Sequence, residues 1–508
     1  MVKVVPASAI SRLELLATEG NTPSSVRVSL AAAINDSTRL ASVNRLPPEI
    51  LASVFAFSKT YCVCDDGFKI NGLTGVCVYW RQIALETANL WTHVDVSLET
   101  PRELIDLLLS RSKNLPIHAH ILNPEPQEKT VTEINNARTE YPIKDMMVAL
   151  EPHIRRVCTL NIKSDTFQSH FVSAVLDTWS DRDSANSLRS LEVDRSLTWG
   201  VYVLWVSSQN KNIEKMLLGV NTLHLRSTVF EWDSPIYSGL VDLQLDFDDQ
   251  EVSMLLWELA NIFAACPALI TLKLAELRVR DVADWIRPSP IVMKHLEVVN
   301  LTRMDPRHAS SLLSLITLSG PRTELSVQIS HTRELNDELA SFFARSKITT
   351  LIHVTYTCEE DCDGCLTDQD CEGGIFRAAK FFPRYLPYTR TLVLENFDFY
   401  SPQVDQPAPP APPSPLQSQL HTMFLVDCVV DFETLKRLVL EIGIQNLGLK
   451  RCTAGRPMSP NLQQELQTIQ ASLQEEYPHL RCWISEVDST RQFECHTMLI
   501  PDYSFWKF

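Results

Sequence analysis

Four cysteines that lie close together come nearest, of all residues in this sequence, to a chemical site. They occur in the segment TCEEDCDGCLTDQDCEGG, at Cys358, Cys362, Cys365 and Cys371. Four thiolates at such short range can close a tetrahedral zinc site, and a pair separated by two residues is a common half-site. The segment also holds seven acidic residues and no basic residue that would help the thiols to ionise. We therefore favour an acidic loop with free thiols, with a zinc knuckle or oxidised disulfides as alternatives.

No catalytic motif accompanies these cysteines. The chain has no P-loop, no dinucleotide-binding G-x-G-x-x-G, no HExxH, no G-x-S-x-G and no kinase signature. Cys495 and His496 are neighbours, but on a strand such neighbours point to opposite sides and would not pair as nucleophile and base. We therefore expect a protein without a catalytic site or a cofactor. A hydrolase or transferase whose site shows no motif is the alternative.

The composition indicates a folded, acidic chain. Its 508 residues are 45% apolar and 21% charged, which suits two to four ordinary domains, or one extended repeat domain with a small module. The formal net charge of −16 argues against partners such as nucleic acid or an anionic membrane, because both need clustered Lys and Arg.

The cysteines indicate a reducing compartment. They number 13, an odd count, and most stand singly in apolar runs, as buried free thiols do. The first residues, MVKVVPASAISRLELLATEG, show no secretory signal, so we expect a cytoplasmic or nuclear protein. The longest apolar stretch, MLLWELANIFAACPALITLKL, is interrupted by polar residues and a proline, and it predicts a helix followed by a strand, not a membrane span.

Two amphipathic helices are predicted between residues 44 and 91. The first begins at Pro47-Pro48, because the amide donors that these prolines lack would be unpaired at a helix start anyway. The second is predicted as one continuous helix over residues 73–85. About fifty residues cannot bury all of these apolar faces, so part of this surface must meet a partner or the following domain. An ordinary helical hairpin is the alternative.

This segment resembles a known family. The pieces LPPEIL, VCVYWRQIAL and NLW follow one another as they do in an F-box, and they resemble most the F-box proteins of mushroom-forming fungi. The resemblance implies binding to a Skp-type adaptor and, through it, to a cullin-based ubiquitin ligase. The loop from Ser58 to Gly72, with Cys62 and Cys64, departs from the pattern. The adaptor-binding residues that the resemblance implies are Leu46, Pro47, Pro48, Glu49, Ile50, Leu51, Val54, Phe55, Val76, Cys77, Trp80, Ile83, Leu90 and Trp91.

The module is predicted to lie between two less regular segments. Residues 1–43 are predicted as a helical leader, 44–92 as the F-box-like module, and 93–153 as a connecting α/β segment. The connecting segment shows strand patterns at 93–96 and 115–122 and helix patterns at 101–112 and 146–154. The first of these helices is expected to turn Leu104, Leu107 and Leu108 inward.

A short pattern recurs from residue 154 to 508. It consists of an apolar residue, two variable ones, an apolar one, a variable one and an apolar one, and most copies are spaced close to the leucine-rich-repeat period of about 20 to 29 residues. Such short strands become stable only when stacked on one another. We therefore predict an α/β fold with a small N-terminal helical module and an irregular leucine-rich-repeat solenoid; a doubly wound α/β domain is the alternative. The central residues of the repeats are Leu160, Leu191, Leu223, Leu243, Leu272, Val299, Leu325, Leu351, Leu392, Met423, Leu447 and Trp483.

Two insertions interrupt the repeats, at 357–374 and 401–415. The first is the cysteine segment, and the second, SPQVDQPAPPAPPSP, cannot form helix or ladder hydrogen bonds and is predicted as an extended spacer. A role as an SH3 or WW ligand is the alternative for the second.

The repeats also predict a binding face. Equivalent central leucines should lie side by side in parallel strands, so the residue after each would face outward in a row that binds a protein substrate. That row comprises Glu192, His224, Gln244 and Lys273. Resemblance and repeats together predict a non-catalytic substrate receptor of a Skp-cullin-F-box ubiquitin ligase. The alternative is a repeat scaffold in which the F-box-like hairpin only caps the solenoid.

Overall fold

The fold was obtained as a computed structural model of the chain. The structure describes residues 42–58, 70–97, 99–123, 147–164, 170–180, 187–195, 204–206, 211–247, 252–281, 289–301, 303–329, 341–356, 388–397, 420–430, 432–454 and 462–485. Nearly all of the predicted leader, the loop with Cys62 and Cys64, and both insertions lie outside these residues.

The chain forms two compact units, and each is described by itself. The first comprises Met1–Ser164 with His170–Leu188, and the second continues from Arg189. This boundary lies later in the chain than residue 154, where the repeats were predicted to begin. The helices and strands described in the first unit are η1 (Ser42–Arg45), α3 (Pro48–Ser58), α4 (Ile70–Val76), α5 (Val78–Glu86), η3 (Ala88–Trp91), β1 (His93–Val96), α6 (Arg102–Arg111), β2 (Ile117–Asn123), η4 (Glu151–Arg156), β3 (Val157–Ser164) and α9 (His170–Ser180).

The first unit begins with a helical module, by which we mean η1, α3, α4, α5 and η3. The predicted single helix over residues 73–85 is wrong, because α4 ends at Val76 and α5 begins at Val78. Cys77 between them is extended, with φ −157° and ψ 169°, and its Sγ accepts a hydrogen bond from the Trp80 backbone amide at 3.4 Å. Cys77 therefore acts as the N-cap of α5 and satisfies an amide that would otherwise lack a partner.

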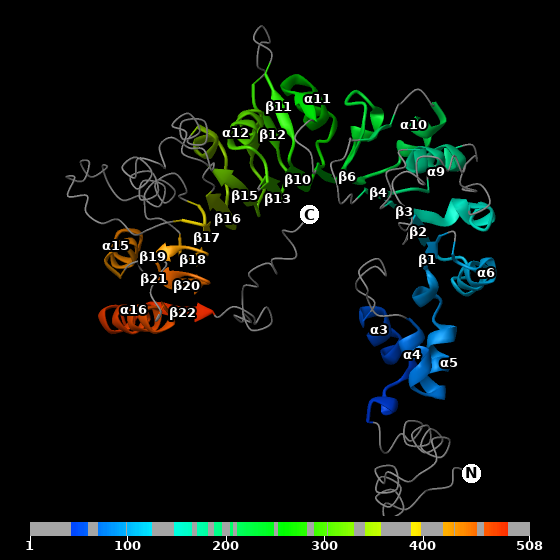
Figure 1. Cartoon of the computed structure of the whole chain (residues 1–508), viewed down its shortest axis with the longest axis horizontal. Helices are drawn as coiled ribbons and strands as arrows, with labels where there is room; N and C mark the ends of the chain where they lie inside the picture. The colour runs from blue at the N-terminus through cyan, green and yellow to red at the C-terminus, as the bar shows by residue number, and fades with distance from the viewer. Residues whose placement is uncertain are drawn as a thin grey trace, which may run out of the picture. The chain divides into compact units, whose positions relative to one another are not determined.

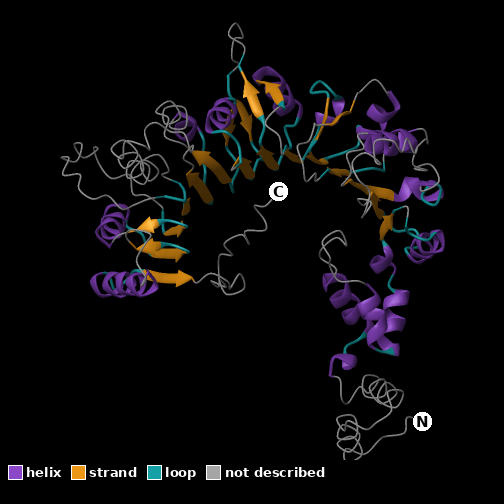
Figure 2. Cartoon of the chain, in the orientation of Figure 1, coloured by secondary structure: helices purple, strands orange, loops and turns teal. Residues whose placement is uncertain are grey.

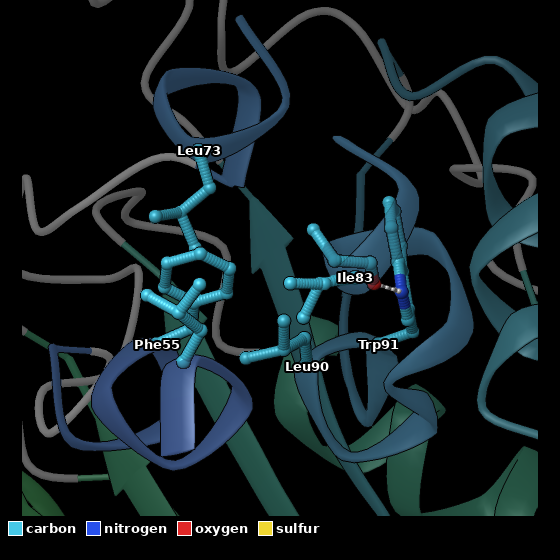
Figure 3. Packing of buried hydrophobic residues seen from close by; sticks show 7 residues of the cluster. Phe55, Leu73, Ile83, Leu90 and Trp91 are labelled. Atoms are coloured by element: carbon cyan, nitrogen blue, oxygen red, sulfur yellow. Dashed lines mark hydrogen bonds between the residues drawn. The ribbon is translucent and has the colours of Figure 1, made fainter. Parts of the chain in front are cut away.

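The helical module has its own hydrophobic core. Phe55 of α3 faces Leu73 of α4, and Leu90 and Trp91 close the core against α5, as Figure 3 shows. The Trp91 indole Nε1 donates a 2.8 Å hydrogen bond to the Ala84 carbonyl, so this large side chain is buried without an unsatisfied donor. The core residues are Leu51, Phe55, Leu73, Ile83, Ala84, Leu90 and Trp91.

Three parallel strands, β1, β2 and β3, follow the module. Their register places Val94 beside Ala119 and Ala119 beside Leu160, so the connecting segment contributes strands of the same kind as β3. The expected inward face of α6 is wrong for two of its three residues: Leu104 and Leu107 are exposed, whereas Leu108 is half-buried against the module core, and Ile105 and Leu109 are buried. Apolar residues occur all around this helix, so periodicity alone could not select the side that packs.

The predicted helix at 146–154 is replaced by a turn and a 3-10 helix. The structure begins η4 at Glu151, and Pro152 lies in its first turn. A proline has no amide to donate within a longer helix, and it is tolerated at a helix start. A new, short helix therefore begins there.

The second unit contains one long parallel sheet, called here the long sheet. Its strands are hydrogen-bonded in chain order, without a reversal of the kind that defines a doubly wound sheet. Every predicted repeat in this unit coincides with one of its strands, which confirms those strand predictions. The strands are β4 (Ser190–Asp194), β6 (Thr222–Arg226), β8 (Asp242–Asp246), β10 (Thr271–Ala275), β13 (Val298–Leu301), β15 (Glu324–Ile329), β16 (Leu351–Tyr356), β17 (Thr391–Glu395), β18 (Thr422–Val426), β20 (Asn446–Lys450) and β22 (Arg481–Ser485).

Two central residues were misplaced by one position. Ile352 pairs with Leu325 and Leu392, and Cys482 pairs with Leu447, whereas Leu351 and Trp483 had been predicted. Each strand offers apolar residues at consecutive positions, and only pairing with the neighbouring strand decides which one enters the core.

The helices of the second unit lie along one side of the long sheet (Figures 1 and 2). They alternate with the strands, so the described part of this unit is a mixed α/β structure. The helices are α10 (Lys211–Leu217), α11 (Leu256–Ala265), α12 (Pro306–Ser314), α15 (Phe432–Ile442) and α16 (Leu462–Glu476), with the 3-10 helix η5 (Pro235–Tyr237). Short strands pair outside the long sheet: β5 (Leu204–Val206) with β7 (Thr228–Phe230), β9 (Ser253–Leu255) with β11 (Arg278–Arg280), β12 (Ile291–Met293) with β14 (Ile316–Leu318), and β19 (Val429–Val430) with β21 (Thr453–Ala454).

Candidate functional site

The helical module exposes a stripe of large apolar side chains on α3. Ile50, Val54 and Phe57 are 48%, 46% and 74% exposed, whereas Leu51 and Phe55 on the same helix are buried in the module core. The exposed residues are spaced four and three positions apart and therefore share one side of α3. A helix that buries one apolar stripe and presents another is suited to contact a second protein.

The α4–α5 part of the module adds a second group of exposed apolar side chains. Val76 and Val78 stand on either side of the cap residue Cys77, and both are exposed. Leu85 lies seven positions after Val78, on the same side of α5, and is also exposed. Phe57, Val78 and Leu85 were absent from the predicted adaptor-binding set, although helical spacing from Ile50 and Val78 could have found them.

Two side-chain hydrogen bonds hold the entry to α3 against α5. The Tyr79 hydroxyl donates to the Leu46 carbonyl at 3.2 Å, and Trp80 Nε1 donates to Asn44 Oδ1 at 2.8 Å. Leu46 itself is half-buried and packs against the module core. These contacts therefore fix the position of the residues just before α3, and the exposed Pro47 and Pro48 follow directly after them.

The structure divides the predicted adaptor-binding residues into two kinds. Pro47, Pro48, Glu49, Ile50, Val54 and Val76 are exposed, and Leu46 and Trp80 are half-buried. Leu51, Phe55, Cys77, Ile83, Leu90 and Trp91 are buried within the module. In this structure the second kind holds the helices together, and only the first kind presents surface to a partner.

The second predicted site lies on four neighbouring strands of the long sheet. Its residues are in register across β4, β6, β8 and β10 and are half-buried: Glu192, His224, Gln244 and Lys273. The leucine that precedes each one is fully buried and in register with its neighbours, which confirms the predicted stacking of Leu191, Leu223, Leu243 and Leu272. We call the strand positions that follow these central residues the outward row.

Charged and polar side chains are paired around this part of the outward row. His224 Nε2 lies 3.2 Å from an Asp242 carboxylate oxygen, and Gln244 Nε2 donates to the other oxygen at 3.2 Å. Burial lowers the pKa of Lys273, while Asp242 acts in the opposite direction. Asp246 accepts from Arg303 and lies near Arg226. The surface is therefore polar and mixed in sign.

The outward row becomes apolar at the other end of the long sheet. Val393, Phe424, Gly448 and Trp483 occupy its register positions on β17, β18, β20 and β22. The Phe424 and Trp483 rings meet edge to face across Gly448, with centroids 5.7 Å apart. A Cβ at position 448 would lie 2.5 Å from Phe424, so this contact depends on glycine. Phe424 is 8% exposed, and this end is not an open binding surface.

The remaining candidate residues from the sequence, the cysteine segment and the Cys495-His496 pair, cannot be placed in the structure. Cys358, Cys362, Cys365, Cys371, Cys495 and His496 all lie outside the described residues. Within the described ranges, no three His, Cys, Asp or Glu side chains are arranged to hold a metal ion. Among the helices that the structure describes, none combines the length and the apolar character needed to cross a membrane.

Comparisons with known proteins do not add to these sites. No family model matches the chain, and no curated protein matches its sequence.

Proposed function

We propose that this protein is a non-catalytic substrate receptor of a Skp-cullin-F-box ubiquitin ligase, acting in the cytoplasm or nucleus. The helical module is the F-box that binds a Skp-type adaptor. The long sheet with its helices is an irregular leucine-rich-repeat solenoid, and the polar part of its outward row contacts a protein substrate.

The exposed stripe of α3 carries this proposal. Ile50, Val54 and Phe57 stay in solvent although the module has a closed core of its own. Removing a large aliphatic or aromatic side chain from water contributes about 1.5–3 kcal/mol. Three such residues on one helix therefore supply a substantial part of the free energy of binding to a partner helix or groove.

The pairing of the long sheet supports the repeat part of the proposal. Its strands are parallel and follow chain order, and one apolar position stays in register from Leu191 to Leu272. Stacked repeats bury a continuous core in this way, each contacting only its neighbours. A rigid array of this kind holds its outward side chains at fixed spacing, about 4.8 Å from strand to strand.

The mechanism that follows is proximity. One part of the receptor binds the adaptor, and the other holds a substrate lysine near a ubiquitin-charged enzyme, so that the transfer becomes effectively intramolecular. The receptor then needs no nucleophile or metal. Mixed charges at Asp242, Lys273 and Glu192 would select a substrate surface of complementary charge pattern.

The decisive experiment uses the exposed stripe alone. Ile50→Asp with Val54→Asp in the full-length protein should abolish binding to a purified Skp-type adaptor in calorimetric titration, because an unpaired charge in a desolvated contact costs several kcal/mol. The fold should persist, since both positions are exposed. Leu51→Asp is unsuitable because Leu51 is completely buried and its replacement would disrupt the core.

A matched control lies on the next long helix. Leu104→Asp with Leu107→Asp makes the same chemical change at two exposed leucines of α6. Adaptor binding should be retained in this variant. Undiminished binding by the α3 variant, or absence of binding by the parent protein, would overturn the adaptor assignment.

A further inference from the structure

Two cysteines occupy equivalent positions in adjacent repeats of the long sheet. Cys428 stands two residues after the end of β18, and Cys452 stands two residues after the end of β20. The residue before each cysteine has the same left-handed backbone, with φ 53° at Asp427 and φ 54° at Arg451. Because the two turns share this geometry, they direct the two cysteine side chains in the same way.

Backbone hydrogen bonds hold the two cysteines side by side. The Asp427 amide donates to the Lys450 carbonyl at 3.0 Å, and the Thr453 amide donates to the Cys428 carbonyl at 2.9 Å. These bonds continue the parallel pairing of β18 with β20 into that of β19 with β21 (Figure 1). Neighbouring strands are about 4.8 Å apart, and disulfides usually join Cα atoms about 4.4–6.8 Å apart. The backbone therefore already places the pair at a distance that a disulfide can span.

The two sulfur atoms lie beside the same part of β18. Cys428 Sγ donates to the Val426 carbonyl at 3.2 Å, and Cys452 Sγ donates to the Leu425 carbonyl, also at 3.2 Å. Cys452 therefore extends its thiol from its own repeat across to β18. A thiol is only a weak hydrogen-bond donor, so losing these bonds costs little.

The surroundings of the two thiols give them different reactivity. Cys428 is 1% exposed, whereas Cys452 is 7% exposed. Burial raises the pKa of Cys428, and hydrogen bonding to the Cys428 thiol lowers the pKa of Cys452. The thiolate is the form that reacts with oxidants. Cys452 is therefore the sulfur that reacts first, with Cys428 beside it as the second thiol.

We propose that Cys428 and Cys452 form an oxidation site, at which hydrogen peroxide produces a disulfide between the two repeats. The Cys452 thiolate attacks one peroxide oxygen and becomes a sulfenic acid, and the other oxygen leaves as hydroxide, which takes up a proton to give water. The Cys428 sulfur then attacks the Cys452 sulfur, and the sulfenic oxygen leaves with the Cys428 proton as a second water. Two thiols and one peroxide thus give one disulfide and two waters. An oxidant little larger than water suits a pair with so little exposed surface.

The bridge would stabilise the last repeats of the long sheet. It closes a loop that contains α15 and β20, and such a cross-link restricts the unfolded chain. Phe424 and Gly448 belong to the two repeats that it joins, so the apolar end of the outward row is fixed with them. Both cysteines are free thiols in this structure, and thiol reductants return the oxidised pair to this state. This inference does not depend on the proposed ligase function.

The test treats the folded full-length protein with hydrogen peroxide, alkylates the remaining thiols and digests the protein with trypsin without reductant. Trypsin cuts after Lys436 and Arg451, so the two cysteines fall in different peptides. We expect mass spectrometry to find these peptides joined through Cys428 and Cys452, and the thermal midpoint to rise on oxidation. Dithiothreitol should remove both the bridge and the rise in thermal midpoint.

Single variants test the order of the two reactions. Cys428→Ser should retain the sulfenic acid on Cys452, where dimedone captures it, and Cys452→Ser should leave Cys428 without a dimedone adduct. The matched control is Cys266→Ser, which removes a fully buried thiol that donates to the Tyr237 carbonyl at 2.9 Å. This control should form the Cys428–Cys452 bridge as the parent protein does.

The parent protein by itself can refute the site, so the result does not depend on the folding of a variant. Circular dichroism shows whether the treated protein is folded. The proposal is wrong if the folded protein forms bridges only among other cysteines or none at all, or if Cys428 joins Cys452 only in urea. A dimedone adduct on Cys428 in the Cys452→Ser variant, with none on Cys452 in the Cys428→Ser variant, would refute the order of reaction.

Discussion

The helical module and the long sheet differ in where they place their large apolar side chains. In the module, Ile50, Val54 and Phe57 remain in solvent, although they flank a closed core. In the long sheet, Leu223 and Leu243 are completely buried, and the polar residues occupy the positions between such leucines. An exposed apolar stripe is therefore the informative feature of the module, and an ordered polar row is the informative feature of the sheet.

The difference has a geometric cause. A strand within the long sheet has a strand on each side and helices over one face, so every central leucine is enclosed. A few short helices enclose only one stripe each, because a small module buries a smaller fraction of its surface. The same apolar residue type therefore contributes stability in one region and binding surface in the other.

Truncating one aliphatic side chain to Ala in each region tests this difference between buried and exposed apolar residues most strongly. Leu243→Ala should lower the free energy of unfolding by about 2–5 kcal/mol, because it leaves a cavity among fully buried neighbours. Ile50→Ala should cost less than about 1 kcal/mol, because Ile50 is 48% exposed. Urea unfolding followed by hydrogen exchange in peptides from β6–β10 and from α3 would locate each change. Equal costs would contradict the assignment of buried and exposed roles.

A smaller effect is expected where the outward row becomes apolar. Gly448→Ala should lower the free energy of unfolding by about 1–3 kcal/mol, because the new Cβ would overlap Phe424. Adding Phe424→Leu should make the pair less than additive, as expected for residues in contact. Gly75→Ala is the matched control, since a Cβ there meets nothing within 4 Å. A full cost that persists in the double variant would argue against the Phe424 contact.

The smallest effect concerns the charge of Glu324 on β15. Burial, with a contribution from Glu297, raises the pKa of Glu324 above its ordinary value of 4.5. The folded state therefore holds the proton more tightly than the unfolded chain, and stability is lost as the pH rises from that value through the raised pKa. Glu324→Gln should increase the thermal midpoint at pH 7 and leave it unchanged below about pH 4. The exposed Glu475→Gln on α16 serves as control, and an equal response in both variants would refute the role of burial.

Some of the candidate site could be predicted and some could not. The pattern around Leu243 predicted both its burial and the register of Gln244 with Lys273. The apolar stripe of α3 was recognised, but Leu51 and Ile50 were assigned the same role although one is buried and the other exposed. Which of the two is buried depends on where α5 and η3 pack against α3, and the spacing of residues within α3 does not predict that.

The sequence by itself determined where the strands and most helices lie, because alternation and helical spacing are local properties of neighbouring residues. The tertiary structure alone decided which of Leu351 or Ile352 enters the core, and which side of α6 packs inward. It also decided that the predicted helix is interrupted at Cys77, and that the rings of His93, His118 and His120 stack on one another. The physical reason is that these outcomes depend on packing between segments distant in the chain; within the sheet, a shift of one residue in register reverses the side of every side chain.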